Sequence, residues 1–216
     1  MRKIAILCLV LFLIEKSGEA QAFKQNDLLI EGFLGGPNIY GQMILKDKYS
    51  IDSTTSNFTM KSSGPRGLKA ELMWGSRTGI SFFYSYANTI ATWQSDSVNP
   101  KNVYQVQAPR NNLMLTINYH FWQKKTRNDL YTISGLGCRF SRHKETTNDT
   151  YWMNRPAPTG LPVVNCRLGL GYRHIFTGGR WVFHSEMCIG GPFLVFGIGY
   201  KTKANIEHKP LNQTED

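Results

Sequence analysis

The sequence lacks an apolar run long enough to form a membrane-spanning helix. Its longest uninterrupted apolar stretch covers only the eleven residues 4–14, whereas a helix needs about 20 to cross a bilayer. Charge is scarce as well, since 19% of the 216 residues are charged and 41% are hydrophobic. These two shortages exclude a helical membrane protein and an intrinsically disordered chain.

Cysteine is too sparse and too widely spaced for a disulfide framework. Cys8 lies in the apolar stretch, and Cys138, Cys166 and Cys188 show no C-x-x-C spacing. Two of the last three cysteines could form one disulfide, but we expect all three to act as small packing residues. The sequence also has no Gly-rich phosphate loop and no cluster of metal ligands. We therefore expect neither a metal nor a cofactor.

The N-terminus has the three parts of a secretory signal peptide. Arg2 and Lys3 precede the apolar stretch, and Ala20-Gln21-Ala22 offers an A-x-A cleavage site. Cleavage after Ala22 removes three basic and two acidic residues, so the formal net charge falls from +10 to +9. We expect a signal peptide over residues 1–22, a β domain over 23–203 and a polar C-terminal tail over 204–216.

Beyond the signal peptide, apolar residues recur with a period of two, which is typical of strands with one apolar and one polar face. The clearest case covers residues 112–122. Its apolar face carries Leu113, Leu115, Ile117, Tyr119 and Phe121, opposite Asn112, Thr116, Asn118 and His120. Eight such segments occur, and most are at least as long as a tilted membrane strand, which needs roughly nine to eleven residues.

The connections between these segments alternate in length. Residues 75–78, 123–129 and 177–179 form short polar turns, whereas 46–66, 95–102 and 143–160 form long polar loops. Short turns at one end and long loops at the other are typical of an up-and-down membrane barrel. The sequence therefore predicts an all-β fold, an eight-stranded antiparallel up-and-down transmembrane β-barrel. A soluble exported β-barrel that binds an apolar ligand is the alternative fold.

Aromatic residues gather beside the short turns, where we expect an interfacial girdle. They are Trp74, Phe121, Trp122, Tyr131, Tyr172, Phe176, Trp181 and Tyr200.

Residues 168–201 resemble the last two hairpins of small outer-membrane β-barrels of the OmpA/OmpX type, in the form common in Bacteroidetes-like bacteria. The matching elements are G-x-G-Y-R at 169–173, a tight turn, Glu186, and G-x-G-Y at 197–200. The resemblance implies an outer-membrane location in a Gram-negative cell and a porin-like barrel. It specifies no activity. Such barrels usually end at an aromatic residue, whereas here Tyr200 is followed by a polar tail.

If the apolar faces meet lipid, the polar faces must line a lumen that eight strands leave just wide enough for side chains. Charges buried there have to pair, because an unpaired one costs several kcal/mol. We expect a structural ion-pair network, with a narrow ion path as the alternative. The predicted members are Lys69, Glu71, Asn118, His120, Arg139, Arg167, Arg173, His184 and Glu186, and Glu31 is a further carboxylate.

The excess of basic residues does not indicate nucleic-acid binding, because it forms no basic stripe and an exported barrel does not meet DNA. Four cations near the long loops could instead contact lipopolysaccharide headgroups, or could simply solubilise the rim. They are Lys101, Arg110, Arg142 and Lys144. We expect outer-membrane lipid as the surrounding partner, and a monomer.

Catalysis is the alternative function. Outer-membrane lipid A deacylases resemble the chain in size and use a His and a Ser two residues apart. His174 has Phe176 at that spacing, and the adjacent pair His184 and Ser185 must point to opposite faces of a strand. We therefore expect a non-enzymatic structural, surface-interaction or narrow-pore role, with a lipid A-modifying hydrolase as the alternative.

Overall fold

The computed structural model describes residues 23–36, 56–94, 102–121, 127–148 and 162–203, which form nine β-strands. None of these residues forms a helix that is long and apolar enough to span a membrane. The strands are β1 (Asp27–Gly35), β2 (Ser56–Met73), β3 (Thr78–Gln94), β4 (Val103–His120), β5 (Asn128–Ser141), β6 (Lys144–Thr147), β7 (Val163–Ile175), β8 (Trp181–Ile189) and β9 (Leu194–Lys203).

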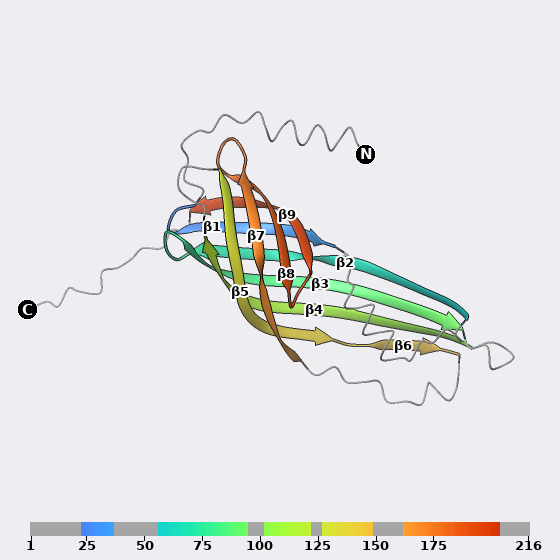
Figure 1. The fold of residues 1–216 in the computed structure, drawn as a ribbon. Helices are drawn as coiled ribbons and strands as arrows, with labels where there is room; N and C mark the ends of the chain where they lie inside the picture. Colours follow the sequence, from blue (N-terminus) through green and yellow to red (C-terminus); the bar gives the residue numbers. More distant parts are fainter. Residues whose placement is uncertain (1–22, 37–55, 95–101, 122–126, 149–161, 204–216) are drawn as a thin grey trace, which may run out of the picture.

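The strands close into a barrel (Figure 1). Apart from the short β6, each strand pairs antiparallel with the strand before it and the strand after it, with β5 pairing with β7, and β1 also pairs with β9, which closes the barrel. Strands β5 and β6 both pair with β4 and act as one interrupted strand, so eight strands form the wall. The predicted eight-stranded antiparallel up-and-down barrel is confirmed.

Strands β2, β3 and β4 are 17 or 18 residues long and continue past the barrel as a protruding sheet (Figure 1). Pairing of β1 with β2 ends at Leu34 and Arg66, so the first ten residues of β2 lie beyond the wall. We expected residues 46–66 to form a loop, and that was wrong for 56–66. Phe58 and Met60 pack against an apolar cluster of the protruding sheet, around Trp93, and so make this segment a strand.

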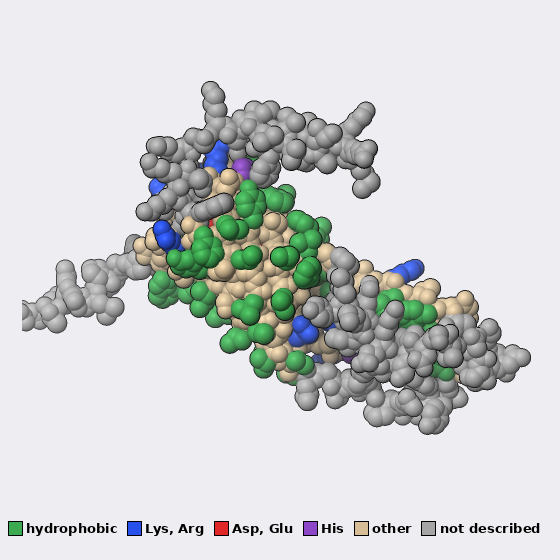
Figure 2. All heavy atoms as spheres, in the orientation of Figure 1, with side chains coloured by type: hydrophobic (Ala, Val, Ile, Leu, Met, Phe, Trp, Pro, Cys, Tyr) green, Lys and Arg blue, Asp and Glu red, His purple; other side chains and the backbone are tan. Residues whose placement is uncertain are grey.

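The period-two pattern assigns the two faces of the wall correctly. Leu115, Ile117 and Leu168 point outward and are 60%, 56% and 57% exposed, whereas their inward neighbours Thr116 and Arg167 are buried. Figure 2 shows hydrophobic side chains spread over the barrel wall. A belt of exposed apolar side chains around a closed barrel is the surface that lipid requires.

The aromatic residues beside the short turns are largely exposed, as a girdle requires: Trp74, Phe121, Phe176 and Trp181 all point outward. Tyr131 was misassigned to this girdle. Its side chain is fully buried in the lumen, because it has the same parity in β5 as the buried residues Asp129 and Ile133. Trp122 lies outside the described residues.

Candidate functional site

The barrel interior holds a group of charged and hydrogen-bonded side chains that we term the lumen network. Six strands contribute to it, and each member is at most 2% exposed. Its members are Glu31, Lys69, Glu71, His120, Asp129, Tyr131, Arg167, Arg173 and Glu186.

Arg173 of β7 organises one half of the lumen network. Its Nε and Nη2 donate to the two carboxylate oxygens of Glu31 at 3.0 and 2.9 Å, a two-bond fork. Nη2 also donates to Glu71, and Nη1 lies 3.8 Å from Asp129 Oδ2. One guanidinium therefore joins strands β1, β2, β5 and β7 across the lumen.

Glu186 of β8 organises the other half. Its Oε1 accepts from Lys69 Nζ at 2.5 Å and from the Tyr131 hydroxyl at 2.7 Å, and its Oε2 accepts from Arg167 Nη2 at 2.6 Å. Lys69 also lies 3.7 Å from Glu71 and 3.8 Å from Glu31, which connects the two halves. Charge-assisted bonds of this kind are the strong ones in proteins.

His120 completes the charge balance of the lumen network. Its Nδ1 lies 2.8 Å from Asp129 and its Nε2 lies 3.0 Å from Glu71. A neutral imidazole has one N–H, so only the imidazolium donates to both carboxylates. With His120 charged, four cationic side chains face the four carboxylates of the network.

Inward-facing glycines make room for these large side chains. A Cβ at Gly171 would run into the Tyr131 ring, and one at Gly79 would run into the Glu71 carboxylate. The Tyr131 ring in turn lies 4.3 Å from the Arg173 guanidinium and 4.9 Å from Lys69 Nζ, as in cation–π contacts. The interior is thus filled by pairing bulky charged residues with glycine.

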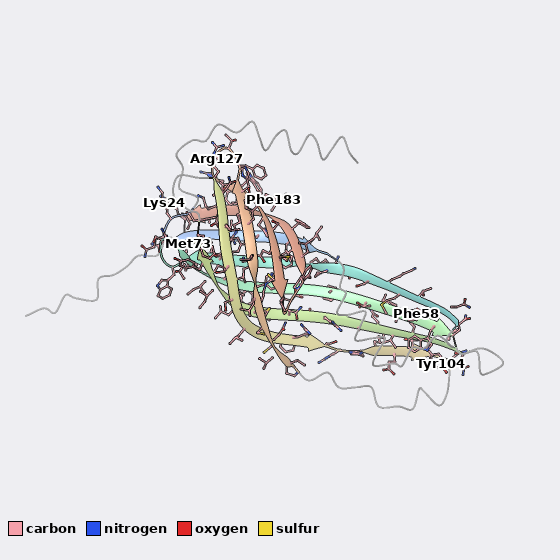
Figure 3. The ribbon with its side chains drawn as sticks, viewed as in Figure 1. Lys24, Phe58, Met73, Tyr104, Arg127 and Phe183 are labelled. Atoms are coloured by element: carbon pink, nitrogen blue, oxygen red, sulfur yellow. The ribbon has the colours of Figure 1, made fainter. Side chains whose placement is uncertain are left out.

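Apolar residues close the lumen at the short-turn end, below the network. Phe23, Leu29, Met73 and Val182 are each at most 1% exposed and pack together with Ile175. Figure 3 shows Met73 and Lys24 at this end of the barrel, far from Phe58 and Tyr104 on the protruding sheet. The charged layer is therefore sealed on one side by hydrocarbon.

Glu31, His184 and Glu186 have the residue types and the spacing of metal ligands, with donor atoms within 4.8 Å of one another. Both carboxylates already accept bonds from cations, namely Arg173, Lys69 and Arg167. His184 Nδ1 lies 3.2 Å from Glu31, but neither of its ring nitrogens forms a hydrogen bond. The chemistry of this group is therefore that of ion pairs.

The nine residues expected in the lumen all lie on inward-facing strand positions, but the structure does not bring all of them together. Six belong to the lumen network, while Asn118 forms a separate hydrogen-bonded group with Ser81 and Thr116. Arg139 is only half-buried and donates to Asn112 near the long-loop end. Sequence reasoning missed Asp129, which it placed in a turn, although the parity of β5 puts Asp129 on the inward face.

The four expected headgroup contacts differ in position. Arg142 and Lys144 are exposed, whereas Lys101 lies outside the described residues. Arg110 was placed wrongly, because it points into the barrel and is only 7% exposed. In β4, Arg110 lies on the same face as the inward-facing residue Asn112. The alternation could have revealed this, but Arg110 was assigned to the rim because it lies near a predicted loop.

The residues considered for catalysis do not form a nucleophile–base pair. His184 is buried in the lumen, and the adjacent Ser185 points to the other face. His174 Nδ1 lies 2.8 Å from Asn128 Oδ1, and the His174 ring meets Phe176 edge-on. None of these contacts gives a histidine a hydroxyl to activate.

No protein-family model and no curated protein matches the chain. Among solved structures, the chain is similar to the outer membrane protein OprG of Pseudomonas aeruginosa, with 13% identity and a TM-score of 0.55 over 86% of this chain and all of that one. The N-terminal β-barrel domain of OprF from the same organism gives 13% identity and a TM-score of 0.47, over 83% of this chain and all of that one. Ail, the attachment invasion locus protein of Yersinia pestis, gives 10% and 0.40 at the same coverage. Wall, lumen and the likeness to OprG agree: the chain has the fold of the small eight-stranded outer-membrane β-barrels.

Proposed function

We propose that the protein is an integral outer-membrane barrel that acts through its scaffold and its long-loop surface, without catalysis and without an open pore. The observation that carries this proposal is the reversed polarity of the barrel. Its outer wall is apolar, and its interior is an ion-paired network. The similarity to outer-membrane barrels supports the same location.

The reversed polarity also argues against a soluble barrel that binds an apolar ligand. Such a barrel needs a polar exterior and an apolar interior, because exposed apolar patches beyond a few hundred Å² make a monomer associate. Here Leu34, Leu136 and Ile189 are 68%, 66% and 68% exposed, while Lys69 and Glu71 are buried. A lipid surrounding makes this arrangement favourable, which supports the membrane location.

The lumen network supports a closed interior. Each of its carboxylates contacts at least one cation or imidazole, and the apolar cluster around Phe23 and Met73 lies below it. An ion crossing this layer has to separate buried pairs, which costs several kcal/mol for each charge. A structural role for the network therefore fits better than a conducting one.

The proposal is tested by membrane fractionation, gel migration and conductance. We expect the protein in the outer-membrane fraction, with heat-modifiable migration and no discrete channel openings in a planar bilayer. Recovery as a soluble periplasmic protein contradicts the membrane proposal, whereas discrete openings contradict the closed lumen.

Arg142 and Lys144 support a contact between the long-loop rim and lipopolysaccharide headgroups. Both side chains are exposed, and cations at a membrane surface attract anionic headgroups by about 1 kcal/mol each. The double substitution Arg142→Gln and Lys144→Gln should weaken binding of purified lipopolysaccharide to the refolded barrel. Unchanged binding assigns these charges to solubility alone.

A further inference from the structure

Two arginines face the lumen at its long-loop end, well above the lumen network. Arg110 of β4 lies opposite Ser141 of β5, and Arg139 of β5 lies opposite Asn112 of β4. All four positions share the inward face of this strand pair. We term Arg110 and Arg139 the mouth pair.

The mouth pair has no carboxylate partner within the described residues. Arg139 Nε donates to Asn112 Oδ1 at 3.1 Å, and neither guanidinium forms an ion pair. The two cations repel each other instead. This contrasts with the lumen network, where Arg167 and Arg173 each bind carboxylates.

Buried or half-buried guanidinium groups without a counter-ion are unfavourable, because desolvation is not offset. Arg110 is 7% exposed, so solvent reaches little of it. A second unmet group lies beside it: the buried Ser141 Oγ has no hydrogen-bond partner. Two guanidinium groups and a free hydroxyl on one inward surface have unused hydrogen-bonding capacity for an anion.

We propose that Arg110, Arg139 and Ser141 bind a small oxyanion of the phosphate or carboxylate class at the long-loop mouth of the lumen. Planar guanidinium groups recognise such anions through paired bonds. Because the site faces inward, a soluble anion or a group reaching in from outside fits it, whereas a headgroup held in the surrounding leaflet does not. This binding activity is independent of the scaffold role proposed above.

The test uses inorganic phosphate and the full chain refolded in detergent. Unfolding in urea is followed with phosphate or with sodium chloride at equal ionic strength, because a ligand that binds only the folded state raises its stability. We expect phosphate to raise the urea midpoint of the wild type. Arg110→Gln and Arg139→Gln should each weaken phosphate binding about tenfold or more.

Arg142→Gln is the matched control, because it removes the same charge from the exposed rim. It should keep the full phosphate response, and it should weaken lipopolysaccharide binding. A phosphate response that survives in Arg110→Gln and Arg139→Gln overturns the proposal, as does one lost only in Arg142→Gln.

The anion site can still be tested if an arginine variant fails to fold. Arg110→Gln removes a like charge, so its midpoint without phosphate should equal or exceed that of the wild type. If it nevertheless fails to refold, Ser141→Ala tests the same site without changing charge. It should weaken the phosphate response, and an unchanged response counts against the site.

Discussion

Glu186 shows how a single residue holds the barrel together. Its carboxylate accepts bonds from Lys69 of β2, Tyr131 of β5 and Arg167 of β7, so four strands meet at one side chain. Such a group stabilises only as a complete set, because removing one member leaves the others buried without a counter-charge.

Glu186→Gln should therefore cost on the order of 3–5 kcal/mol of unfolding free energy. The amide keeps the shape of the side chain but removes the charge that Lys69 and Arg167 share. Neutralising the cation that pairs with Glu186 at the same time, in Glu186→Gln with Arg167→Gln, should recover much of the loss, because Glu186 is the carboxylate that pairs with Arg167. Urea unfolding of the refolded barrel in detergent measures both variants.

The control is Lys144→Gln, which neutralises an exposed charge of β6 and should change the stability little. A Glu186→Gln barrel as stable as the wild type contradicts the role given to this carboxylate. Conductance of the same variant in a planar bilayer then reports whether the pair also blocks the lumen.

At the scale of the element, β4 shows what a two-residue period means for the two faces of the barrel wall. Leu113, Leu115 and Ile117 are 41%, 60% and 56% exposed, whereas Met114 and Thr116 between them are buried. At the proposed membrane location the outward row meets lipid and the inward row meets the lumen, so one strand needs two opposite chemistries.

Leu115→Arg should destabilise the barrel by about 2–4 kcal/mol, because it places a charge near the middle of the lipid-facing wall. Phe121→Arg is the matched control beside the short turns, where the penalty should fall to about 0–1 kcal/mol. Urea titrations in lipid vesicles measure the difference. Equal penalties at the two depths contradict the proposed membrane position of the belt.

The strands also carry glycines on their inward face, which leave room for the large side chains of the lumen network. Gly171→Ala should cost about 1–3 kcal/mol, because its Cβ overlaps the Tyr131 ring and displaces the bond to Glu186. Gly32→Ala is the control, since its Cβ points outward with its nearest neighbour, Leu68, at 3.9 Å. Thermal or urea unfolding compares them, and similar losses in both contradict the filling argument.

At the scale of the whole molecule, the fold turns its charges inward and its apolar side chains outward. This arrangement leaves few polar or charged side chains on the outer wall. His174 and Ser185 are the polar groups nearest to a hydrolase pattern; His174 contacts Asn128 and Phe176, and Ser185 lies on the face of β8 opposite His184.

Alanine at His174, His184 or Ser185 should leave the lipid A acylation pattern of a producing cell unchanged. The reason is geometric, since His184 and Ser185 point to opposite faces of β8 and His174 contacts Asn128 and Phe176. Mass spectrometry of lipid A from cells with and without the protein is the measurement. Deacylated lipid A that disappears with one of these substitutions restores the hydrolase hypothesis.

The sequence by itself determined the facing of nearly every strand residue and the number of strands in the barrel wall. These properties depend on the local alternation of side chains and on the residues of the turns, so they can be predicted from the sequence without knowledge of the tertiary structure. The same parity put Lys69, Glu71 and Glu186 on inward positions before any partner was known.

Only the tertiary structure decided which charges meet. Glu31 and Arg173 are 142 residues apart, and their pairing depends on the closure of β1 on β9 and on the stagger between strands. The sequence also did not show where β4 and β5 begin, and for this reason Asp129, Tyr131 and Arg110 were misassigned. A period of two fixes the side of the wall on which a residue lies, but its height and its neighbours follow from long-range register.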